Sequence, residues 1–247
     1  MTDLGPLDSF LGLEIKRNRS ERTLYLSQSH YGQKILQLHR MERCNPALTP
    51  ADPHVRLEKS PPGFEATLYE RKRYQSGVGS LMYAMLGSRP DIAYAVAKVS
   101  QYSINPDTSH WTAVKGIFRY LAGTPDRKLC YERVGSGAGY TNADWGSSDD
   151  GKSIGGFTFL LNGAAISWNS KKQSMVALSS TEAEYMALTQ GVKESIWFQA
   201  ILRDFGALQH LDEIRNINVD NQGAMALARN AEYHSRTKHI DIQYHFI

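Results

Sequence analysis

The chain begins with two short runs of β-forming residues and then changes to a helical spacing. FLGLEI (10–15) and TLYLSQ (23–28) flank the basic stretch KRNRSER, which predicts a hairpin with a polar turn. In YGQKILQL (31–38) the apolar residues fall on one stripe, as in a helix. The five prolines between residues 44 and 63 predict a connector rather than a core element.

The middle of the chain has the pattern of helices. GVGSLMYAMLGS (77–88) is apolar and ends before an Arg-Pro pair, DIAYAVAKVSQYS (91–103) follows, and SHWTAVKGIFRYLAGT (109–124) comes after an Asn-Pro pair. Ser109 is expected to cap the last of these helices. The apolar stripe of that helix, which we expect to pack against a neighbouring helix, consists of Trp111, Val114, Phe118 and Leu121.

The last part of the chain returns to strands. GYTNADW (139–145), IGGFTFLL (154–161) and AAISWNS (164–170) each have the composition of a strand. The Asn162-Gly163 pair between the last two is the strongest short signal for a hairpin. The sequence therefore predicts a three-stranded antiparallel arrangement here.

Helices and one further strand complete the chain. A long helix is predicted from about residue 179 to 205, then a short strand at 217–219 and a helix at 221–230. The order β-β-β-α-β-α predicts the α/β (α+β) class, with a mixed sheet and packed helices. A β-hairpin and a small helical region precede this sheet.

One stretch, GSSDDGKS (146–153), matches the phosphate-loop pattern G-x-x-x-x-G-K-[ST]. A phosphate loop needs a strand before it and a helix after it, whereas a predicted strand follows here. Asp149 and Asp150 would also repel a triphosphate. We interpret the stretch as a turn between two strands, so a nucleotide-hydrolysing protein is disfavoured.

Composition excludes several classes of protein. No apolar run reaches the ~18 residues that span a membrane, and MTDLGPLDSF is not a signal peptide, so no membrane partner is expected. Cys44 and Cys130 lie far apart, which indicates reduced thiols and argues against zinc. The net charge of +3 is compatible with nucleic acid without requiring it.

Polar side chains at strand ends are candidates for a catalytic site. Asn142 and Asp144 project from one face of the first strand of the sheet, because side chains alternate along a strand. Asp220 follows the short strand INV, at its carboxyl-terminal tip. Strand tips of this kind are where sheets present functional groups.

The long helix contributes a further acid. Ser179 and Glu182 fit the capping box S-x-x-E, so Glu182 is expected to close the helix start. Glu184 remains, and it shares a face with Ala187 and Leu188. Glu184 is therefore expected to point toward whatever that face packs on.

Oxygen ligands of this kind suit Mg²⁺ or Mn²⁺. Two such ions about 4 Å apart activate water and stabilise the leaving oxygen in phosphodiester cleavage. The alternative is that these residues are ordinary surface acids, with Asp144 in a turn, Glu184 exposed and Asp220 capping the last helix. Spacing alone leaves both interpretations open.

The segments resemble the C-terminal part of a copia-type retrotransposon polyprotein, and the resemblance covers essentially the whole chain. Similar to the end of the reverse transcriptase (palm hairpin, thumb and connecting helices) are DLGPLDSFLGLEIKR, YQSGVGSLMYAMLGSRPDIAYAV and HWTAVKGIFRYLAGT. Similar to its ribonuclease H domain are GYTNADW, ISWNSKKQSMVALSSTEAEYMAL, VDNQGAMALA and RTKHIDIQYHFI.

The resemblance implies a domain order and an activity. It assigns 1–63 to the end of the palm and thumb, 64–134 to a helical connection, and 135–247 to an RNase H-like domain truncated at its C-terminus. That family's domain cuts the RNA strand of an RNA·DNA hybrid with two Mg²⁺ ions. Glu184 matches its helix glutamate and Asp220 its strand-tip aspartate. The partners implied are the hybrid and the remainder of the polyprotein, in cytoplasmic virus-like particles or the nucleus.

The sequence departs from the family's pattern at two places. The family motif is Tyr-x-Asp-Ala-Asp, and Asn142 stands where its first, metal-bridging acid would be. Asp144 lies roughly 6.5 Å further along the strand. The family's fourth acid belongs to a later segment, for which Asp241 is the candidate stand-in. We therefore expect a weakened nuclease or, alternatively, an inactive hybrid-binding remnant of a decayed element. No Tyr-x-Asp-Asp turn is present, so no polymerase activity is expected.

Contacts with nucleic acid do not require every acid. Lysines after the third strand are candidates for phosphate contacts, and hydroxyls at the helix start are candidates for the 2′-OH of RNA. A basic cluster near the end, which also contains His234 and His239, is a further candidate. A solvated surface charge is the alternative for each. The candidate nucleic-acid-binding residues are Lys171, Lys172, Gln173, Ser180, Thr181, Arg236 and Lys238.

Overall fold

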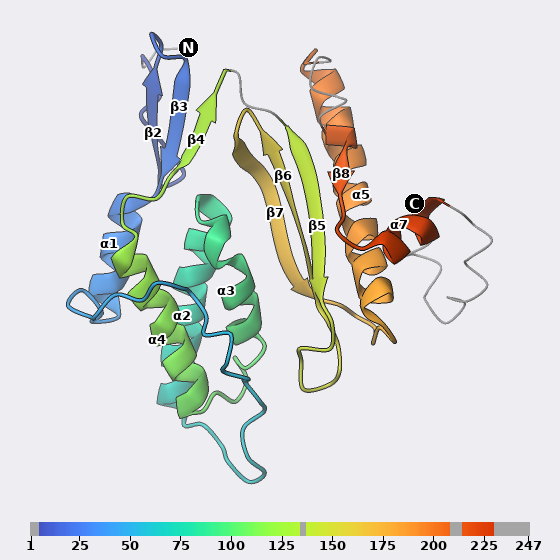
Figure 1. The fold of residues 1–247 in the computed structure, drawn as a ribbon. Helices are drawn as coiled ribbons and strands as arrows, with labels where there is room; N and C mark the ends of the chain where they lie inside the picture. Colours follow the sequence, from blue (N-terminus) through green and yellow to red (C-terminus); the bar gives the residue numbers. More distant parts are fainter. Residues whose placement is uncertain (1–4, 134–136, 208–213, 230–247) are drawn as a thin grey trace. The chain divides into compact units, whose positions relative to one another are not determined.

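The structure is a computed structural model that describes residues 5–133, 137–207 and 214–229 (Figure 1). The chain divides into two compact units, Met1–Arg133 and Val134–Ile247. Each unit has a sheet of its own, and each is described separately below. None of the helices in the described ranges has the length and apolar character that a membrane-spanning helix needs.

The first unit contains a four-stranded antiparallel sheet with the order β1-β2-β3-β4. The predicted hairpin is confirmed as β2 and β3, which pair through Ile15 and Leu26. Its first strand begins at Leu13 rather than at residue 10 and runs on to Asn18, into the predicted turn. The strand β4 was not predicted, because its four residues follow a turn and carry too short an apolar pattern. The strands are β1 (Ser9–Phe10), β2 (Leu13–Asn18), β3 (Thr23–Ser27) and β4 (Leu129–Glu132).

The helices of the first unit begin at other residues than predicted, and two of these starts have a clear capping cause. One helix begins at Leu68 rather than at residue 77, because Thr67 and Glu70 form a capping box ahead of it. The other is capped by Asp107 rather than Ser109, since the Asp107 carboxylate accepts the backbone N–H of Ser109 at 2.8 Å. The helices are α1 (Ser29–Leu38), α2 (Leu68–Gly87), η1 (Pro90–Ile92), α3 (Ala93–Ser100) and α4 (Thr108–Gly123).

One apolar core holds the helices of the first unit together. Val114, Phe118 and Leu121 of the predicted stripe are buried in it, and Trp111 packs against it from a partly exposed position. Leu57 from the proline-rich connector is also buried there, 4% exposed, so the connector does supply a core residue. The core thus includes residues on both sides of the predicted boundary at 63/64, and that domain division stays a prediction.

The second unit contains a mixed sheet with the order β7-β6-β5-β8, as the α+β class predicts. The strands β5, β6 and β7 are antiparallel neighbours, while β8 runs parallel to β5. Asn162 and Gly163 both have positive φ, as a tight type I′ hairpin turn requires. The strands are β5 (Ala138–Asp144), β6 (Ile154–Leu161), β7 (Ala164–Lys172) and β8 (Ile217–Asn218).

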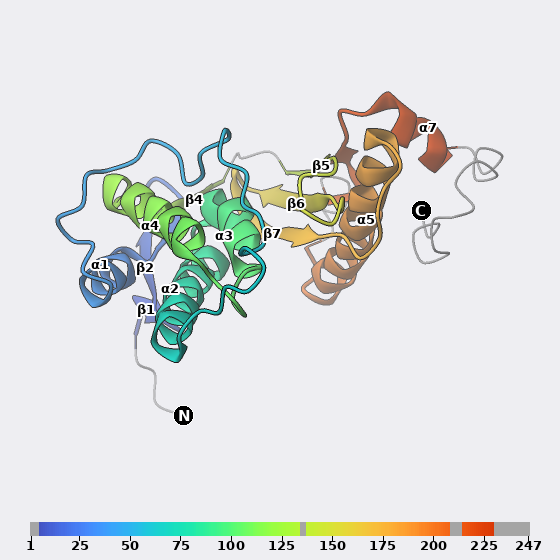
Figure 2. The same ribbon diagram turned by 90° about the horizontal axis from the view of Figure 1, so that it is seen from below.

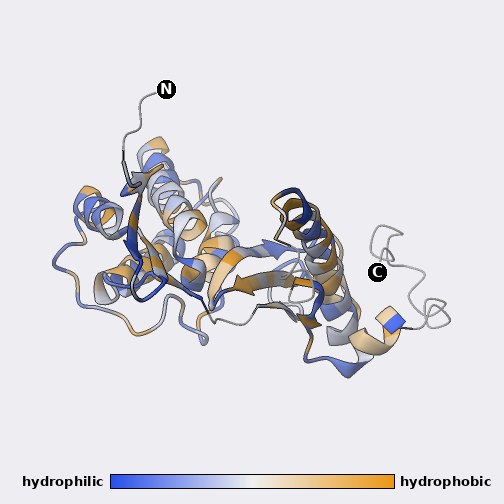
Figure 3. Cartoon of the chain, turned by 90° about the horizontal axis from the view of Figure 1, so that it is seen from above, coloured by the Kyte–Doolittle hydropathy of each residue, from blue (hydrophilic) through white to orange (hydrophobic). Residues whose placement is uncertain are grey.

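A long helix, α5 (Ser180–Asp204), packs along one face of this sheet, against β5 and β6. Figures 1 and 2 both show it lying across the strands, with the short helix α7 (Gln222–Arg229) beside its first turns. Hydrophobic residues run along the strands and parts of α5 (Figure 3). Phe159 and Leu202 are buried between the two layers, so burial of the shared apolar face fixes α5 on the sheet.

The close approach of α5 to β5 depends on Gly191. A Cβ atom at Gly191 would lie 2.5 Å from Thr141 Cγ2, closer than carbon atoms pack. We expect Gly191→Ala to lower the free energy of unfolding by about 1–3 kcal/mol, measured by urea denaturation. Thr141→Ser removes the methyl group that the new Cβ would meet, so the double variant should recover part of the loss. Additive effects of the two substitutions would contradict this contact.

Candidate active site

The candidate site lies where β5 and β8 end. Because these two strands are parallel, their carboxyl ends meet at one edge of the sheet. Tyr140 pairs with Asn218, so continuing the same register two residues brings Asn142 beside Asp220. The Asn142 Nδ2 atom donates a hydrogen bond to Asp220 Oδ2 at 3.4 Å. The first predicted pair of site residues is thus in contact.

Glu184 occupies the place that a longer β8 would take. The N–H of Gly139 points toward the β8 side and bonds to Asn216, and by alternation the N–H of Ala143 points the same way. The strand β8 ends at Asn218 and leaves that N–H without a strand partner. Glu184 Oε1 accepts it at 2.9 Å. The expectation that Glu184 faces the packed side of its helix is confirmed.

Burial makes the Glu184 carboxylate an unusual group. Its side chain is 6% exposed, and its Oε2 atom has no hydrogen-bond partner within the described ranges. Burial raises the pKa of Glu184 above its usual value of 4.5; the Ala143 N–H lowers this pKa, and the charge of Asp220 raises it. A carboxylate in this position would be stabilised by a cation.

Asp220 is exposed and does not cap the helix that follows it. Asn221 has that role, because its Oδ1 atom accepts the backbone N–H of Ala224 at 2.9 Å. The surface interpretation in which Asp220 caps the last helix is therefore wrong. The Asp220 carboxylate faces Asn142 instead, beside the buried Glu184.

Asp144 has a different environment from Asn142, although both lie on β5. Its Oδ1 atom accepts the backbone N–H of Ile154 at 2.6 Å, across the hairpin from β5 to β6. This hydrogen bond places the Asp144 carboxylate at the closing end of the hairpin. In the described part of the chain, no group of three or more His, Cys, Asp or Glu side chains forms a metal cluster. Asp241 lies outside the described residues.

The start of α5 confirms part of the predicted capping box. The Ser179 hydroxyl accepts the Glu182 N–H at 3.2 Å, as predicted. The Glu182 carboxylate, however, accepts the N–H of Leu178 at 2.8 Å, one residue before the cap. Glu182 therefore serves the helix start, and Glu184 is the acid directed at the sheet.

The candidate nucleic-acid residues have different environments. Lys171 is exposed, whereas Lys172 forms an ion pair with Asp150 at 2.8 Å. Gln173 is 9% exposed and donates to the backbone oxygen of Ala183 at 2.8 Å, so it joins β7 to α5. Ser180 is exposed, and Thr181 Oγ1 donates to Asn221 Oδ1 at 3.4 Å. Outside the described residues lie His234, Arg236, Lys238 and His239.

The phosphate-loop match is a hairpin loop, as interpreted from the sequence. It joins the antiparallel strands β5 and β6, and no helix follows it. Inside the loop, Gly151 N–H bonds to Ser148 at 2.9 Å, and Gly146 N–H bonds to the buried Ser153 hydroxyl at 3.1 Å. These hydrogen bonds within the loop account for the residues that match the pattern.

Two polar residues near the sheet were not singled out from the sequence. Asn169 on β7 and Gln190 on α5 line a cavity together with Lys171. Their signal was periodicity: Asn169 lies two residues before Lys171 on the strand, and Gln190 follows Ala187 at helical spacing. Only the packing of α5 on the sheet shows that these residues line one cavity.

No family model matches the chain, and no solved structure does. The retrovirus-related Pol polyprotein from transposon TNT 1-94 of Nicotiana tabacum is 46% identical over 100% of the chain, which spans 19% of that relative. The corresponding polyprotein from transposon RE2 of Arabidopsis thaliana is 39% identical over 98% of the chain, which spans 16% of that relative. An uncharacterized mitochondrial protein of Arabidopsis thaliana is 35% identical, over 81% of this chain and 82% of its own length. The chain therefore belongs to the family of retrotransposon Pol polyproteins and corresponds to a part of them.

Proposed function

We propose that the chain is the copia-type stretch in which the end of the reverse transcriptase precedes an RNase H-like domain. The second unit would then cleave the RNA strand of RNA·DNA hybrids, and the remainder of the polyprotein would be its partner. The observation that carries the proposal is the buried Glu184 carboxylate beside Asp220, whose Oε2 atom has no hydrogen-bond partner among the described residues. A buried, unpaired carboxylate at strand ends is a functional-site candidate.

The oxygen atoms at this site fit one Mg²⁺ or Mn²⁺ ion. Glu184 and Asp220 would supply carboxylate oxygens, and Asn142 would supply an amide oxygen. When bound, a divalent ion supplies charge stabilisation for the phosphodiester and lowers the pKa of water. Two carboxylates balance the charge of one such ion. Among the described residues, no third carboxylate is grouped with Glu184 and Asp220 to balance a second ion, which supports a weakened nuclease.

The chain's own residues would position the substrate and the ligands. Asn142 donates to Asp220 and holds that carboxylate toward Glu184. The Ala143 N–H fixes one oxygen of Glu184, which leaves the other directed away from the backbone. Ser180 and Thr181 lie one turn before Glu184 on α5, where their hydroxyls would contact the 2′-OH of the RNA strand.

A catalytically inactive hybrid-binding module is the alternative function. The observation that favours it is the hydrogen bond between Asn142 and Asp220, which satisfies one Asp220 oxygen without an ion. An amide brings no negative charge, so it compensates a divalent cation less well than the family's aspartate would. Substrate binding would survive this change, because phosphate contacts supply most of the affinity for nucleic acid.

Cleavage of a labelled RNA·DNA hybrid in Mg²⁺ and in Mn²⁺ tests the proposal. We expect slow cleavage of the RNA strand by the native chain and about 10²-fold less by Asp220→Asn, because that substitution removes one of the two charged ligands. Double-stranded RNA and duplex DNA are the controls and should stay intact. Hybrid binding without cleavage in either ion would support the inactive module, and absence of binding would contradict both functions.

A further inference from the structure

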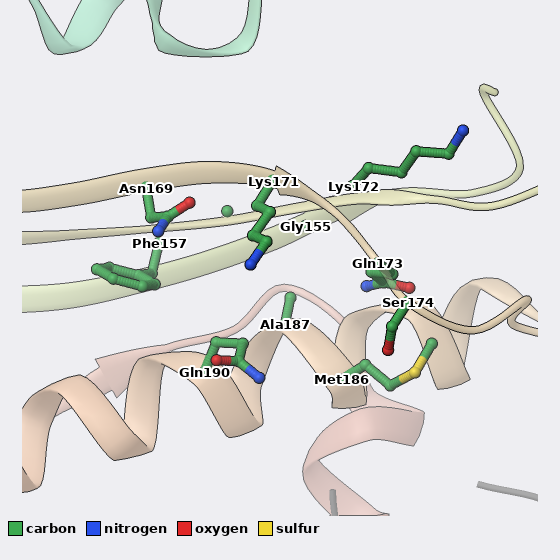
Figure 4. Close-up of a pocket in the computed structure, with 11 residues that line it drawn as sticks. Gly155, Phe157, Asn169, Lys171, Lys172, Gln173, Ser174, Met186, Ala187 and Gln190 are labelled. Carbon is green, nitrogen blue, oxygen red and sulfur yellow. The ribbon is translucent and has the colours of Figure 1, made fainter. Parts of the chain in front are cut away.

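The cavity lined by Asn169, Lys171 and Gln190 lies between α5 and the hairpin of β6 and β7. Its volume is about 150 Å³, and it is lined by strand residues on one side and helix residues on the other (Figure 4). Gly155 leaves room in its strand wall, because a Cβ there would lie 3.1 Å from Gln173 Nε2 and 3.3 Å from Ala187 Cβ. The polar residues in its lining include Asn169, Lys171, Gln173 and Gln190.

Strand register directs two of these side chains at the helix. Asn169 pairs with Phe157, and Lys171 pairs with Gly155. A Cβ atom at Gly155 would point toward Ala187 of α5. Partners in an antiparallel pair share a face, so Asn169 and Lys171 also face α5. Figure 4 shows the Lys171 ammonium between strand and helix, while Lys172 points away from the cavity.

Several polar groups in this cavity have no partner among the described residues. Gln173 is 9% exposed; its Nε2 atom bonds to Ala183, but its Oε1 atom is unpaired within the described ranges. In the same part of the chain, the side chains of Asn169, Lys171 and Gln190 form no hydrogen bond or ion pair. A buried amide oxygen without a partner is unfavourable, and a ligand that donates a hydrogen bond to it would remove that penalty.

The cavity is separate from the candidate active site. Glu184 shares a helix face with Gly191, which contacts Thr141 of β5. Gln190 shares the adjacent face with Ala187 and Glu194, and Glu194 accepts a hydrogen bond from Ser167 of β7 at 2.6 Å. A ligand in the cavity would therefore lie on the β7 side of α5, and the acids lie on its β5 side.

The chemistry of the lining limits the ligand. A cavity of about 150 Å³ accommodates a single six-membered ring, and Asn169 and Lys171 are exposed at its mouth. A purine base would therefore enter by one edge, with its sugar and phosphate outside the cavity. The amides of Asn169 and Gln190 offer both donors and acceptors, in the pairing that side-chain amides make with the edge of adenine. The Lys171 ammonium is a point charge suited to phosphate. A ring with polar edges joined to a phosphate is a nucleotide.

We propose that this cavity binds one nucleotide, with its base against the amides and its phosphate on Lys171. This inference goes beyond the proposed nuclease function, because it requires neither the acids nor cleavage. The nucleotide can come from two sources with the same chemistry, a free mononucleotide or one unit of a single strand.

Calorimetric titrations of the full chain in EDTA test this site, since no cleavage occurs without a divalent ion. The probes are inorganic phosphate, adenosine monophosphate and a short oligo(dA) strand. We expect Lys171→Ala to weaken binding of the strand about tenfold and to reduce its salt slope by about 0.7, the share of one phosphate contact. Lys193→Ala removes the same charge from α5 at a residue that does not line the cavity, so it is the matched control and should leave binding within about twofold.

Each outcome decides the proposal. If adenosine monophosphate binds and Lys171→Ala weakens it, the site takes a free nucleotide; if only the strand shows this dependence, it takes a nucleotide within a chain. Equal effects of Lys171→Ala and Lys193→Ala would show that the strand is attracted by diffuse surface charge and would overturn the proposal. Binding of inorganic phosphate as tight as that of the nucleotide, or no binding of any probe, would overturn it too.

Discussion

Asn142→Asp is expected to raise the rate of hybrid cleavage in Mg²⁺ by about 10²-fold over the native chain. The substitution places a third carboxylate in contact with Asp220, whose Oδ2 atom is 3.4 Å from the Asn142 amide nitrogen. Three negative charges compensate two divalent ions better than two do. The measurement is the initial rate of RNA-strand cleavage at matched concentrations of the two proteins.

The same substitution should change metal-free stability in the opposite direction. In EDTA, Asn142→Asp replaces a hydrogen-bond donor to Asp220 by a like charge, and it adds repulsion near the buried Glu184. We therefore expect a lower melting temperature without metal and a larger rise on adding Mg²⁺ than in the native chain. Thermal melts with and without Mg²⁺ measure both effects on one sample.

Asn216→Asp is the matched control for this prediction. Asn216 is exposed and precedes β8, so the substitution adds the same charge to the same unit without placing it beside Asp220. It should change neither cleavage nor the response to Mg²⁺. If Asn142→Asp behaves like this control in both measurements, Asn142 does not stand at a metal position.

Local patterns predicted the second unit closely because its elements have strong local signals. The strand 154–161 was predicted with the bounds that β6 has, and Asn162-Gly163 forms the expected turn. Elements with tertiary causes were missed. The strand β4 exists because β3 offers it an edge, and α2 starts early because Thr67 and Glu70 cap a turn that has little apolar periodicity.

The site illustrates the same limit. Sequence spacing brought forward Glu184 and Asp220 and placed Asn142 and Asp144 on one strand face, but it did not show what surrounds either of the latter two. The pairing of β5 with β6 separates them, because Asp144 bonds to Ile154 across the hairpin. Glu184 lies against the sheet because β8 ends early, at Asn218. The Ala143 N–H therefore has no strand partner and bonds to Glu184 instead. The sequence around Glu184 does not show where β8 ends, because the length of β8 depends on its pairing with β5.

Glu184→Gln is expected to abolish hybrid cleavage, by about 10³-fold or more, while hybrid binding stays within a few-fold of the native chain. Glutamine keeps an oxygen that can accept the Ala143 N–H, so the helix stays fixed to the sheet. What it removes is the charge on the atom that would bind the ion. Single-turnover cleavage and hybrid binding by anisotropy separate these two effects, and loss of binding together with cleavage would contradict this role.

The pH dependence of stability tests the same residue without a substrate. Because the pKa of Glu184 is raised in the folded state, its contribution to stability is fully present below its usual value of 4.5 and is lost as the pH rises through the raised pKa. Glu184→Gln has no titrating group at this position and therefore no such loss. As the pH rises through this window, the unfolding free energy of the native chain should fall relative to that of the variant. Glu194→Gln makes the same chemical change on the same helix, where the carboxylate accepts from Ser167, and it should not reproduce this trend. A variant that loses activity while gaining stability at neutral pH identifies a carboxylate that is kept for binding a cation and not for the fold.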